Sequence, residues 1–299
     1  MTQRRYNPFH QAHLFQHMRN PVAGNIYYVE GTDGNDANDG RTLETAFETI
    51  THALTVVDSD NNDYVYVRRI DNDAEEYPLI VDEHFVHLIG MPYGASPRPQ
   101  MIPPGDTDGF DIQAGGVEIA GFDFGTVAAN NDACITVTTG TQWRIHIHHN
   151  NFAWQTEAYD CIRLDGATNV YIHHNNFGAH GYTNVGVYIF DAVRARIEDN
   201  LFFVQNSTPV ADANFGVHVD NTLQQSTILN NVFVVPDAAD GEAITLDSYG
   251  GCMIDGNRAM SGNIVMTFNP YRDLNVAAAN EHAWGVNYAG PAPTYPVTV

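Results

Sequence analysis

The sequence predicts an all-β chain: a right-handed single-stranded parallel β-helix whose short strands coil around one hydrophobic core. Three observations predict it. A hexapeptide recurs at intervals of 25 residues and more, a second strand pattern lies between its copies, and a candidate capping helix precedes them. Self-similarity with a period of 20 to 50 residues is typical of solenoids, in which each repeat packs only on its neighbours.

The first repeated segment has the pattern I-x-x-N. It reads IHHNNF at 147–152 and 172–177, IEDNLF at 197–202, ILNNVF at 228–233 and IDGNRA at 254–259. Asparagine tolerates unusual backbone angles at a tight turn, and its amide can bond the copy on the next coil, about 4.8 Å away. The segments that start at Val86 and Val117 look like earlier copies with glycine in place of asparagine. We therefore predict an internal asparagine ladder, made of Asn150, Asn175, Asn200, Asn231 and Asn257.

The second repeated segment alternates apolar and polar residues, which is typical of a strand with one buried face. Its copies are CITVT at 134–138, CIRLD at 161–165, GVYIFD at 186–191, GVHVD at 216–220 and AITLD at 243–247. The inward pairs are expected to be Ile135/Val137, Ile162/Leu164, Val187/Ile189, Val217/Val219 and Ile244/Leu246.

The ends of the repeat region predict a division into three parts. Residues 25–54 contain a strand, a Gly/Asn/Asp loop and a helix at about 45–54, which we expect to cap the open end of the solenoid. Residues 25–262 form the β-helix, residues 1–24 an N-terminal arm, and residues 263–299 a proline-containing C-terminal cap or tail.

These features together resemble the pectate-lyase-like β-helix superfamily. The strand, the GNDANDG loop, the A-F-E-T-I helix and the I-x-x-N coils are similar to β-helix repeat proteins of polysaccharide-active enzymes and of phage tailspikes. The resemblance covers roughly residues 25–265 and implies a fold rather than a function, since this architecture hosts lyases, hydrolases and plain binding proteins.

Composition excludes several partners. With 36 acidic residues against 13 arginines and no lysine, the formal charge is −23, which disfavours nucleic acid and anionic membranes. The N-terminus lacks the apolar segment of a Sec signal peptide, and we find no apolar run long enough to cross a membrane. The three cysteines are too few for a disulfide framework.

Polar residues that follow the inward pairs form one candidate catalytic site. The outward column of the second strand would present Arg163, Tyr188 and His218, and a neighbouring column would hold Asp165, Phe190, Asp220 and Asp247. Asp220 and Asp247 would lie on adjacent coils about 5 Å apart, as in glycoside hydrolysis. The alternatives are ordinary turn-forming aspartates or a binding groove without catalysis.

Metal and sugar sites are weaker candidates. His148, His173 and Glu198 could hold a transition metal, although side chains stacked in one column line up rather than converge. The acidic loop at 33–40 could take Ca²⁺ but lacks the EF-hand spacing, so we expect no cofactor. Tyr188, Tyr182 and Trp154 are candidates for stacking on sugars, or for the core or an interface.

Two functions from different classes remain. The first is a non-enzymatic virion structural protein, such as a head decoration, spike or tailspike-type protein, with glycan binding as an additional property. The second is a polysaccharide lyase or glycoside hydrolase that acts on the outer face of the β-helix. The absence of known lyase, polygalacturonase, P-loop and nucleophile-elbow motifs favours the first. For this first function we predict a homotrimer at a virion surface or outside the cell. Residues 1–24 would contact another virion protein, and a surface polysaccharide would be a further partner.

Overall fold

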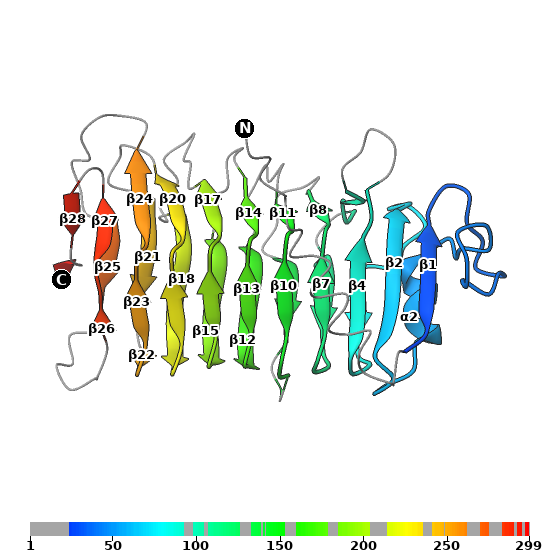
Figure 1. Cartoon of the computed structure of the whole chain (residues 1–299), viewed down its shortest axis with the longest axis horizontal. Helices are drawn as coiled ribbons and strands as arrows, with labels where there is room; N and C mark the ends of the chain where they lie inside the picture. Colours follow the sequence, from blue (N-terminus) through cyan, green and yellow to red (C-terminus); the bar gives the residue numbers. More distant parts are fainter. Residues whose placement is uncertain are drawn as a thin grey trace, which may run out of the picture.

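The protein is a parallel β-solenoid, a right-handed tube of three sheets whose strands lie side by side along its length (Figure 1). The computed structural model describes residues 24–92, 98–104, 107–125, 133–138, 140, 142–152, 160–178, 185–203, 214–235, 241–247, 249–261, 270–274, 283–289, 292–294 and 297–298. Each coil contributes one strand to each sheet in turn, and neighbouring coils pair in parallel. The predicted fold class is confirmed.

We name the sheets A, B and C. Sheet A contains β1 (Ile26–Glu30), β2 (Asp63–Arg69), β4 (Val86–Gly90), β7 (Glu118–Ala120), β10 (His146–His148), β13 (Tyr171–His173), β16 (Arg196–Glu198), β19 (Thr227–Leu229), β23 (Met253–Asp255) and β26 (Ala283–Trp284). Sheet B contains β3 (Leu79–Val81), β6 (Phe110–Ile112), β9 (Ala133–Val137), β12 (Asp160–Thr168), β15 (Val185–Val193), β18 (Asn214–Gln224), β21 (Gly241–Leu246), β22 (Tyr249–Gly250), β25 (Tyr271–Asp273) and β29 (Val297–Thr298). Sheet C contains β5 (Gln100–Met101), β8 (Asp123–Phe124), β11 (Asn151–Phe152), β14 (Asn176–Phe177), β17 (Leu201–Phe203), β20 (Val232–Val235), β24 (Arg258–Ser261), β27 (Asn287–Ala289) and β28 (Ala292–Thr294).

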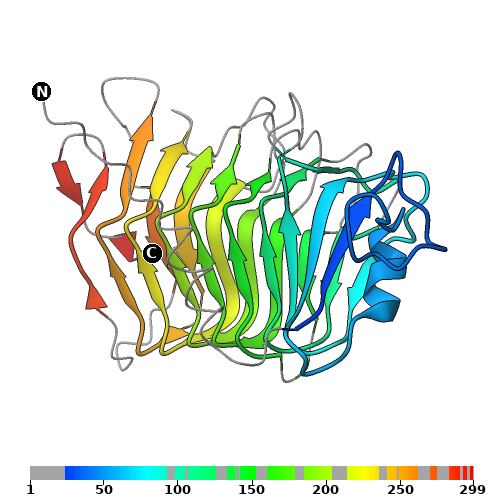
Figure 2. The same ribbon diagram turned by 45° about the vertical axis from the view of Figure 1, so that its right-hand side comes forward.

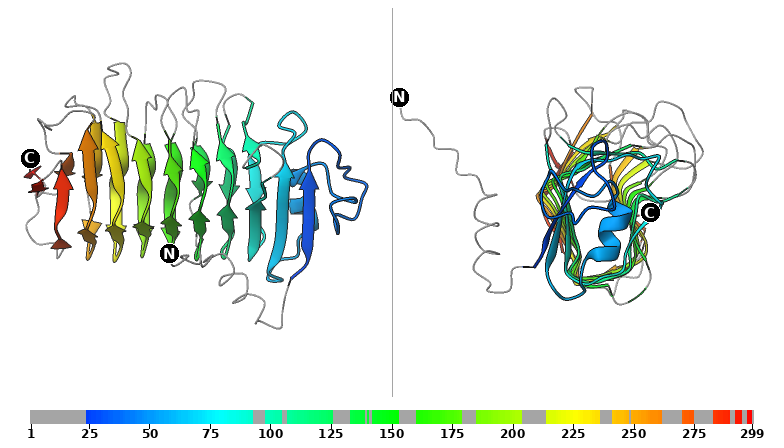
Figure 3. Two further views of the ribbon diagram at one scale, coloured as in Figure 1. Left: turned by 45° about the horizontal axis from the view of Figure 1, so that its top comes forward. Right: turned by 90° about the vertical axis from the view of Figure 1, so that its right-hand side faces the viewer.

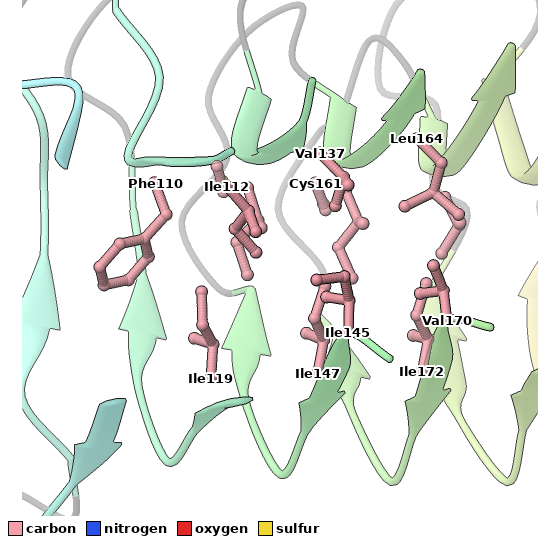
Figure 4. Close-up of a cluster of buried hydrophobic side chains, with 14 of the residues drawn as sticks. Phe110, Ile112, Ile119, Val137, Ile145, Ile147, Cys161, Leu164, Val170 and Ile172 are labelled. Carbon is pink, nitrogen blue, oxygen red and sulfur yellow. The ribbon is translucent and has the colours of Figure 1, made fainter. Parts of the chain in front are cut away.

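The core is a set of columns in which equivalent apolar side chains of successive coils stack inside the tube. Figure 4 shows one such row, in which Ile119, Ile147 and Ile172 lie beside one another. All five predicted inward pairs of sheet B, from Ile135/Val137 to Ile244/Leu246, are fully buried. Period-2 alternation therefore identified the inner and outer faces of these strands.

Phenylalanines form a second column, at sheet C. The rings of Phe152, Phe177, Phe202 and Phe233 lie nearly parallel, with centroids 4.3 to 4.8 Å apart. A side chain at Gly186 or Gly216 would collide with this column, since an added Cβ would lie 2.7 Å from the Phe202 ring and 2.4 Å from that of Phe233. The small residues at this position of sheet B thus make room for the aromatic stack.

The asparagine ladder is confirmed and continues by one member that the sequence pattern missed, Asn287. From Asn175 onward, the Oδ1 of each asparagine accepts hydrogen bonds from the backbone N–H and the side-chain Nδ2 of the asparagine one coil earlier. Asn150 bonds Asn175 in this way at 3.0 and 3.2 Å. The side chains are almost fully buried. The ladder therefore satisfies polar groups inside the tube at every coil.

The unusual backbone angle belongs to the residue before each of the five predicted ladder asparagines, which corrects our expectation. His149, His174, Asp199, Asn230 and Gly256 have φ values between 53° and 69°. In the coil of β7, Gly121 occupies this left-handed position, and Phe122 rather than a glycine replaces the asparagine. The turn therefore needs a left-handed residue and the ladder needs an amide, at two consecutive positions.

A short helix, α2 (Ile50–Val56), lies across the N-terminal end of the tube (Figures 2 and 3). Its buried Ile50 and Ala53 join the core, as expected of a cap. The helix begins later than the predicted position 45 because Phe47 pairs with β1, donating to the Tyr28 carbonyl and accepting from Glu30 N–H. Among the described residues, no helix has the length and apolar character that crossing a membrane requires.

The solenoid extends past residue 262, where we expected the repeat to end. In the described parts of 263–299, β25, β26 and β27 add one more strand to sheets B, A and C. Strand β28 then turns back and pairs antiparallel with β27. This last antiparallel strand covers the edge of sheet C, which would otherwise be open to another strand.

Candidate functional site

The outer face of sheet B carries a row of polar side chains in register from coil to coil. It runs from Asp111 through Thr136, Arg163, Tyr188 and His218 to Thr245. Because their chain neighbours point into the core, these side chains face outward. This places Arg163, Tyr188 and His218 in one column, as the sequence pattern predicted.

Arg163 lies among carboxylates at one end of this row. Its Nε donates to Asp165 Oδ2 at 3.3 Å, and its Nη1 lies 3.8 Å from Asp160 Oδ2. Its guanidinium group also lies 4.9 Å from the centre of the Tyr188 ring, within cation–π range. The one described guanidinium of the row is therefore fixed by two acids and an aromatic ring.

Asp160 is a member of this group that the sequence did not identify. It begins β12 and is 7% exposed. Burial raises its pKa to about 7, although Arg163 and a backbone N–H act in the opposite direction. The aspartate therefore titrates close to neutral pH. A single polar residue before a strand gives no signal of such burial.

Replacing Asp160 with asparagine is expected to change how stability depends on pH. The folded pKa of about 7 exceeds the reference value of 3.8, so the stability contributed by the neutral acid is complete below pH 4 and is lost as pH rises through 7. Asparagine does not ionise. The unfolding free energy of Asp160→Asn relative to the native protein should therefore rise by about 2–3 kcal/mol between pH 5 and pH 8, measured by urea denaturation. A constant difference over this range would show that Asp160 is ionised throughout.

Two carboxylates meet at the other end of the row. Asp220 and Asp247 follow the inward pairs of β18 and β21, and an oxygen of each lies within 4.8 Å of the other and of a His218 ring nitrogen. The Tyr188 hydroxyl donates to Asp220 Oδ2 at 2.6 Å. His218 Nε2 lies 3.9 Å from Asp247 Oδ1, and burial lowers the pKa of this histidine. The predicted closeness of Asp220 and Asp247 is thus seen in the structure.

This second group is open to solvent and suits two kinds of chemistry. Asp220 is exposed and the Asp247 side chain is 34% exposed, so a ligand can reach both. A pair of carboxylates can transfer protons and attack a sugar carbon, and the same pair with His218 can also bind a divalent cation.

Asp165 does not share the column of Phe190, Asp220 and Asp247, which corrects the register predicted for it. It pairs with Asp191, because the strand register shifts between Ile189 and Asp191. The shift leaves Phe190 on the surface, 40% exposed. An irregularity of one residue cannot be read from the alternation of apolar residues.

The outer face of sheet A holds the other candidate residues. His148 and His173 lie on neighbouring coils with their rings stacked, but Glu198 is bound by Arg196 at 2.8 and 3.1 Å and by Thr227 at 3.0 Å. The carboxylate that does join the histidines is Glu118, which the sequence did not suggest. The predicted set of His148, His173 and Glu198 is thus not gathered at one point.

Hydrogen bonds to His148 and His87 hold the pKa of Glu118 far below its usual range, against the effect of its burial. Burial and the neighbouring imidazoles of His146 and His148 lower the pKa of His173 to about 2. The histidine group around Glu118 therefore combines a carboxylate anion with a neutral ring.

The remaining candidates are placed as follows. In the loop 33–40, Asp36 accepts hydrogen bonds from Glu48 N–H and from the backbone and hydroxyl of Thr49, and Asp39 accepts one from Thr45. These carboxylates support the start of α2, and no described group of metal-ligating residues includes them. Trp154 and Tyr182 lie outside the described residues.

Comparison with known proteins finds one family and several similar solved structures. The GH136 lacto-N-biosidase from Eubacterium ramulus, as its selenomethionine derivative, is similar with a TM-score of 0.56 and 13% identity, over 93% of this chain and 62% of that chain. Its native form gives a TM-score of 0.49 and 11% identity over the same shares. A rhamnogalacturonan lyase gives 0.48 and 15% identity, over 79% of this chain and 74% of that one.

The TM-score of 0.56 shows that this chain shares its fold with the lacto-N-biosidase, and the chain spans 62% of that protein. No curated protein matches the sequence. A family model described as "Protein of unknown function (DUF1565)" matches residues 32–289. Since this match includes every sheet of the solenoid, the chain belongs to the DUF1565 family.

Proposed function

We propose that the protein is a carbohydrate-active β-helix that binds and hydrolyses a glycan along the outer face of sheet B. The observation that carries the proposal is the pair Asp220 and Asp247, whose oxygens approach within 4.8 Å on a solvent-accessible surface. Retaining glycosidases hold their two carboxyl groups about 5–5.5 Å apart. The GH136 lacto-N-biosidase, which has the same fold, supports a carbohydrate as the substrate class.

The contacts assign a role to each carboxylate. Asp220 is held by the Tyr188 hydroxyl, which donates to Oδ2 and orients the carboxylate, so we assign it as the nucleophile. Asp247 protonates the glycosidic oxygen as the bond to the anomeric carbon breaks and Asp220 bonds to that carbon. It then takes a proton from water, whose oxygen displaces Asp220 and completes the hydrolysis.

The charge of this face favours a neutral or cationic sugar over a uronate. Asp111, Asp160, Asp165, Asp220 and Asp247 all belong to it. The described guanidinium of the row, on Arg163, is already engaged by Asp160 and Asp165. A polyanionic glycan would be repelled here, and lyase chemistry on such a glycan requires the acid group to be neutralised. Hydrolysis of a neutral glycan is therefore the activity that suits the face best.

The test is a screen of neutral oligosaccharides and amino-sugar polymers with a reducing-end assay on the full chain. We expect cleavage by the native protein and a loss of at least a hundredfold in Asp220→Asn and Asp247→Asn. Asp191→Asn is the control, because its carboxylate lies on the same face but bonds Asn221. Binding of a glycan with equal, undetectable cleavage in all four proteins would contradict hydrolysis. A parallel measurement with EDTA separates acid–base catalysis from a cation held by His218, Asp220 and Asp247.

The virion surface role stays a prediction from the sequence. Of the arm on which it depends, residues 1–23 lie outside the described part of the chain. A protein that binds a surface glycan without cleaving it, and that sediments as a trimer, would favour this non-enzymatic function over the hydrolase.

A further inference from the structure

A dense group of imidazoles lies on the outer face of sheet A, away from the proposed glycan face. Glu118 on β7 pairs in register with His146 on β10, and His148 pairs with His173 on β13. The ring centroids of His146 and His148 are 4.3 Å apart, and those of His146 and His173 are 4.7 Å apart. Three successive coils therefore bring metal-ligating side chains to one place.

The side chains converge because they lean diagonally between coils instead of standing in separate columns. Glu118 Oε1 lies 2.7 Å from His148 Nε2, one step across and two residues along the strands. His146 Nε2 lies 2.5 Å from His173 Nε2 along the equivalent diagonal, one coil further. His146 is thus the centre of the group, with a carboxylate on one side and a second imidazole on the other.

We infer that Glu118, His146 and His148 form a binding site for a divalent transition-metal ion, with His173 in reach as a fourth ligand. One possible ligand atom of each of the first three residues lies within 4.8 Å of the others. Zinc bound at about 2.0–2.2 Å from each donor draws its ligands closer together than this, and side-chain rotations can close the gap. Imidazole with carboxylate is a donor set that suits Zn²⁺ rather than Ca²⁺.

The surroundings support a site that is accessible but partly dehydrated. The side chains of Glu118 and His148 are each 16% exposed, so an ion can enter from solvent. A second contact also fixes the carboxylate, since His87 Nδ1 lies 2.5 Å from Glu118 Oε2 and His87 Nε2 lies 3.0 Å from Asn62. Such outer contacts orient metal ligands. A bound ion would tie together the coils of β7, β10 and β13.

The experiment uses the full chain, treated with EDTA, dialysed and titrated with Zn²⁺ by calorimetry, with Co²⁺ absorption as a second readout of coordination. We expect one zinc ion per chain and a raised Tm in its presence. His146→Ala and the near-isosteric Glu118→Gln should each weaken binding at least about a hundredfold. Circular dichroism of each variant verifies that the solenoid is folded.

The matched control is His218→Ala, which removes a histidine from the other possible cation site, on sheet B. It should leave the zinc affinity unchanged. Zinc binding that is lost in His218→Ala but kept in His146→Ala and Glu118→Gln would overturn the inference. So would the absence of binding to the folded native protein at about 100 µM Zn²⁺, since a site with a Kd below this concentration would be more than half occupied. Glycan cleavage is measured separately, so its failure can be told apart from a failure of zinc binding at Glu118, His146 and His148.

Discussion

Replacing Asn175 with alanine is expected to lower the free energy of unfolding by about 4 kcal/mol, because several buried polar groups lose partners at once. The side-chain oxygen of Asn175 accepts from the backbone N–H and Nδ2 of Asn150. Its Nδ2 donates to the Ile147 carbonyl at 2.9 Å and to Asn200 at 3.1 Å. Each buried group left without a partner costs about 1–3 kcal/mol. Urea denaturation followed by circular dichroism measures the loss.

The next residue provides a control of the same type. Asn176 is half-buried, and its Nδ2 donates one hydrogen bond, to Asn151 at 2.8 Å. Asn176→Ala should therefore cost about 1 kcal/mol or less. Equal losses in the two variants would mean that the internal ladder contributes no more than a surface hydrogen bond.

Replacing Phe202 with alanine should also cost about 4 kcal/mol, for a reason of packing alone. The ring is fully buried and lies between those of Phe177 and Phe233, at centroid distances of 4.3 and 4.7 Å. Truncation removes two stacking contacts and leaves a cavity that the rigid coils cannot close. Phe→Ala changes in cores typically cost 3–5 kcal/mol.

Phe203 is the matched control for this prediction. It is the next residue in β17, it points outward and it is half-exposed. Phe203→Ala should lower the unfolding free energy by about 1 kcal/mol or less, in the same urea experiment. A loss from Phe203→Ala as large as that from Phe202→Ala would contradict the assignment of inner and outer faces in sheet C.

The fold could be predicted because every coil needs the same kinds of residue at the same positions. The isoleucine of I-x-x-N must be buried in sheet A, and the asparagine three residues later must bond the next coil. The isoleucine and the asparagine are three residues apart in each copy, so the pattern occurs several times in the sequence. The alternation in sheet B likewise predicted that Asp220 and Asp247 would be neighbours.

The features that could not be predicted depend on local structure that occurs once and is not repeated from coil to coil. The burial of Asp160 is set by what surrounds the start of β12, and Phe190 leaves the register through one local shift. Glu118 lies in an early coil that lacks the asparagine, so the repeat gave no reason to align it with the histidines. Diagonal contacts between coils, such as Glu118 with His148, follow from side-chain rotations that no periodicity encodes.

Because the solenoid is built of coils, its length can change in evolution by the gain or loss of whole coils. Asn150, Asn175 and Asn200 are spaced by 25 residues and bonded in sequence, so losing one whole coil would let the outer two asparagines meet. Losing one residue within a strand would turn the rest of that strand's apolar side chains toward solvent. A change in the turns is tolerated, because the ladder asparagines Asn200, Asn231 and Asn257 are 31 and 26 residues apart. Length is therefore added or removed in steps of about 4.8 Å. A site built across two coils, such as Asp220 with Asp247, survives any step that does not separate them.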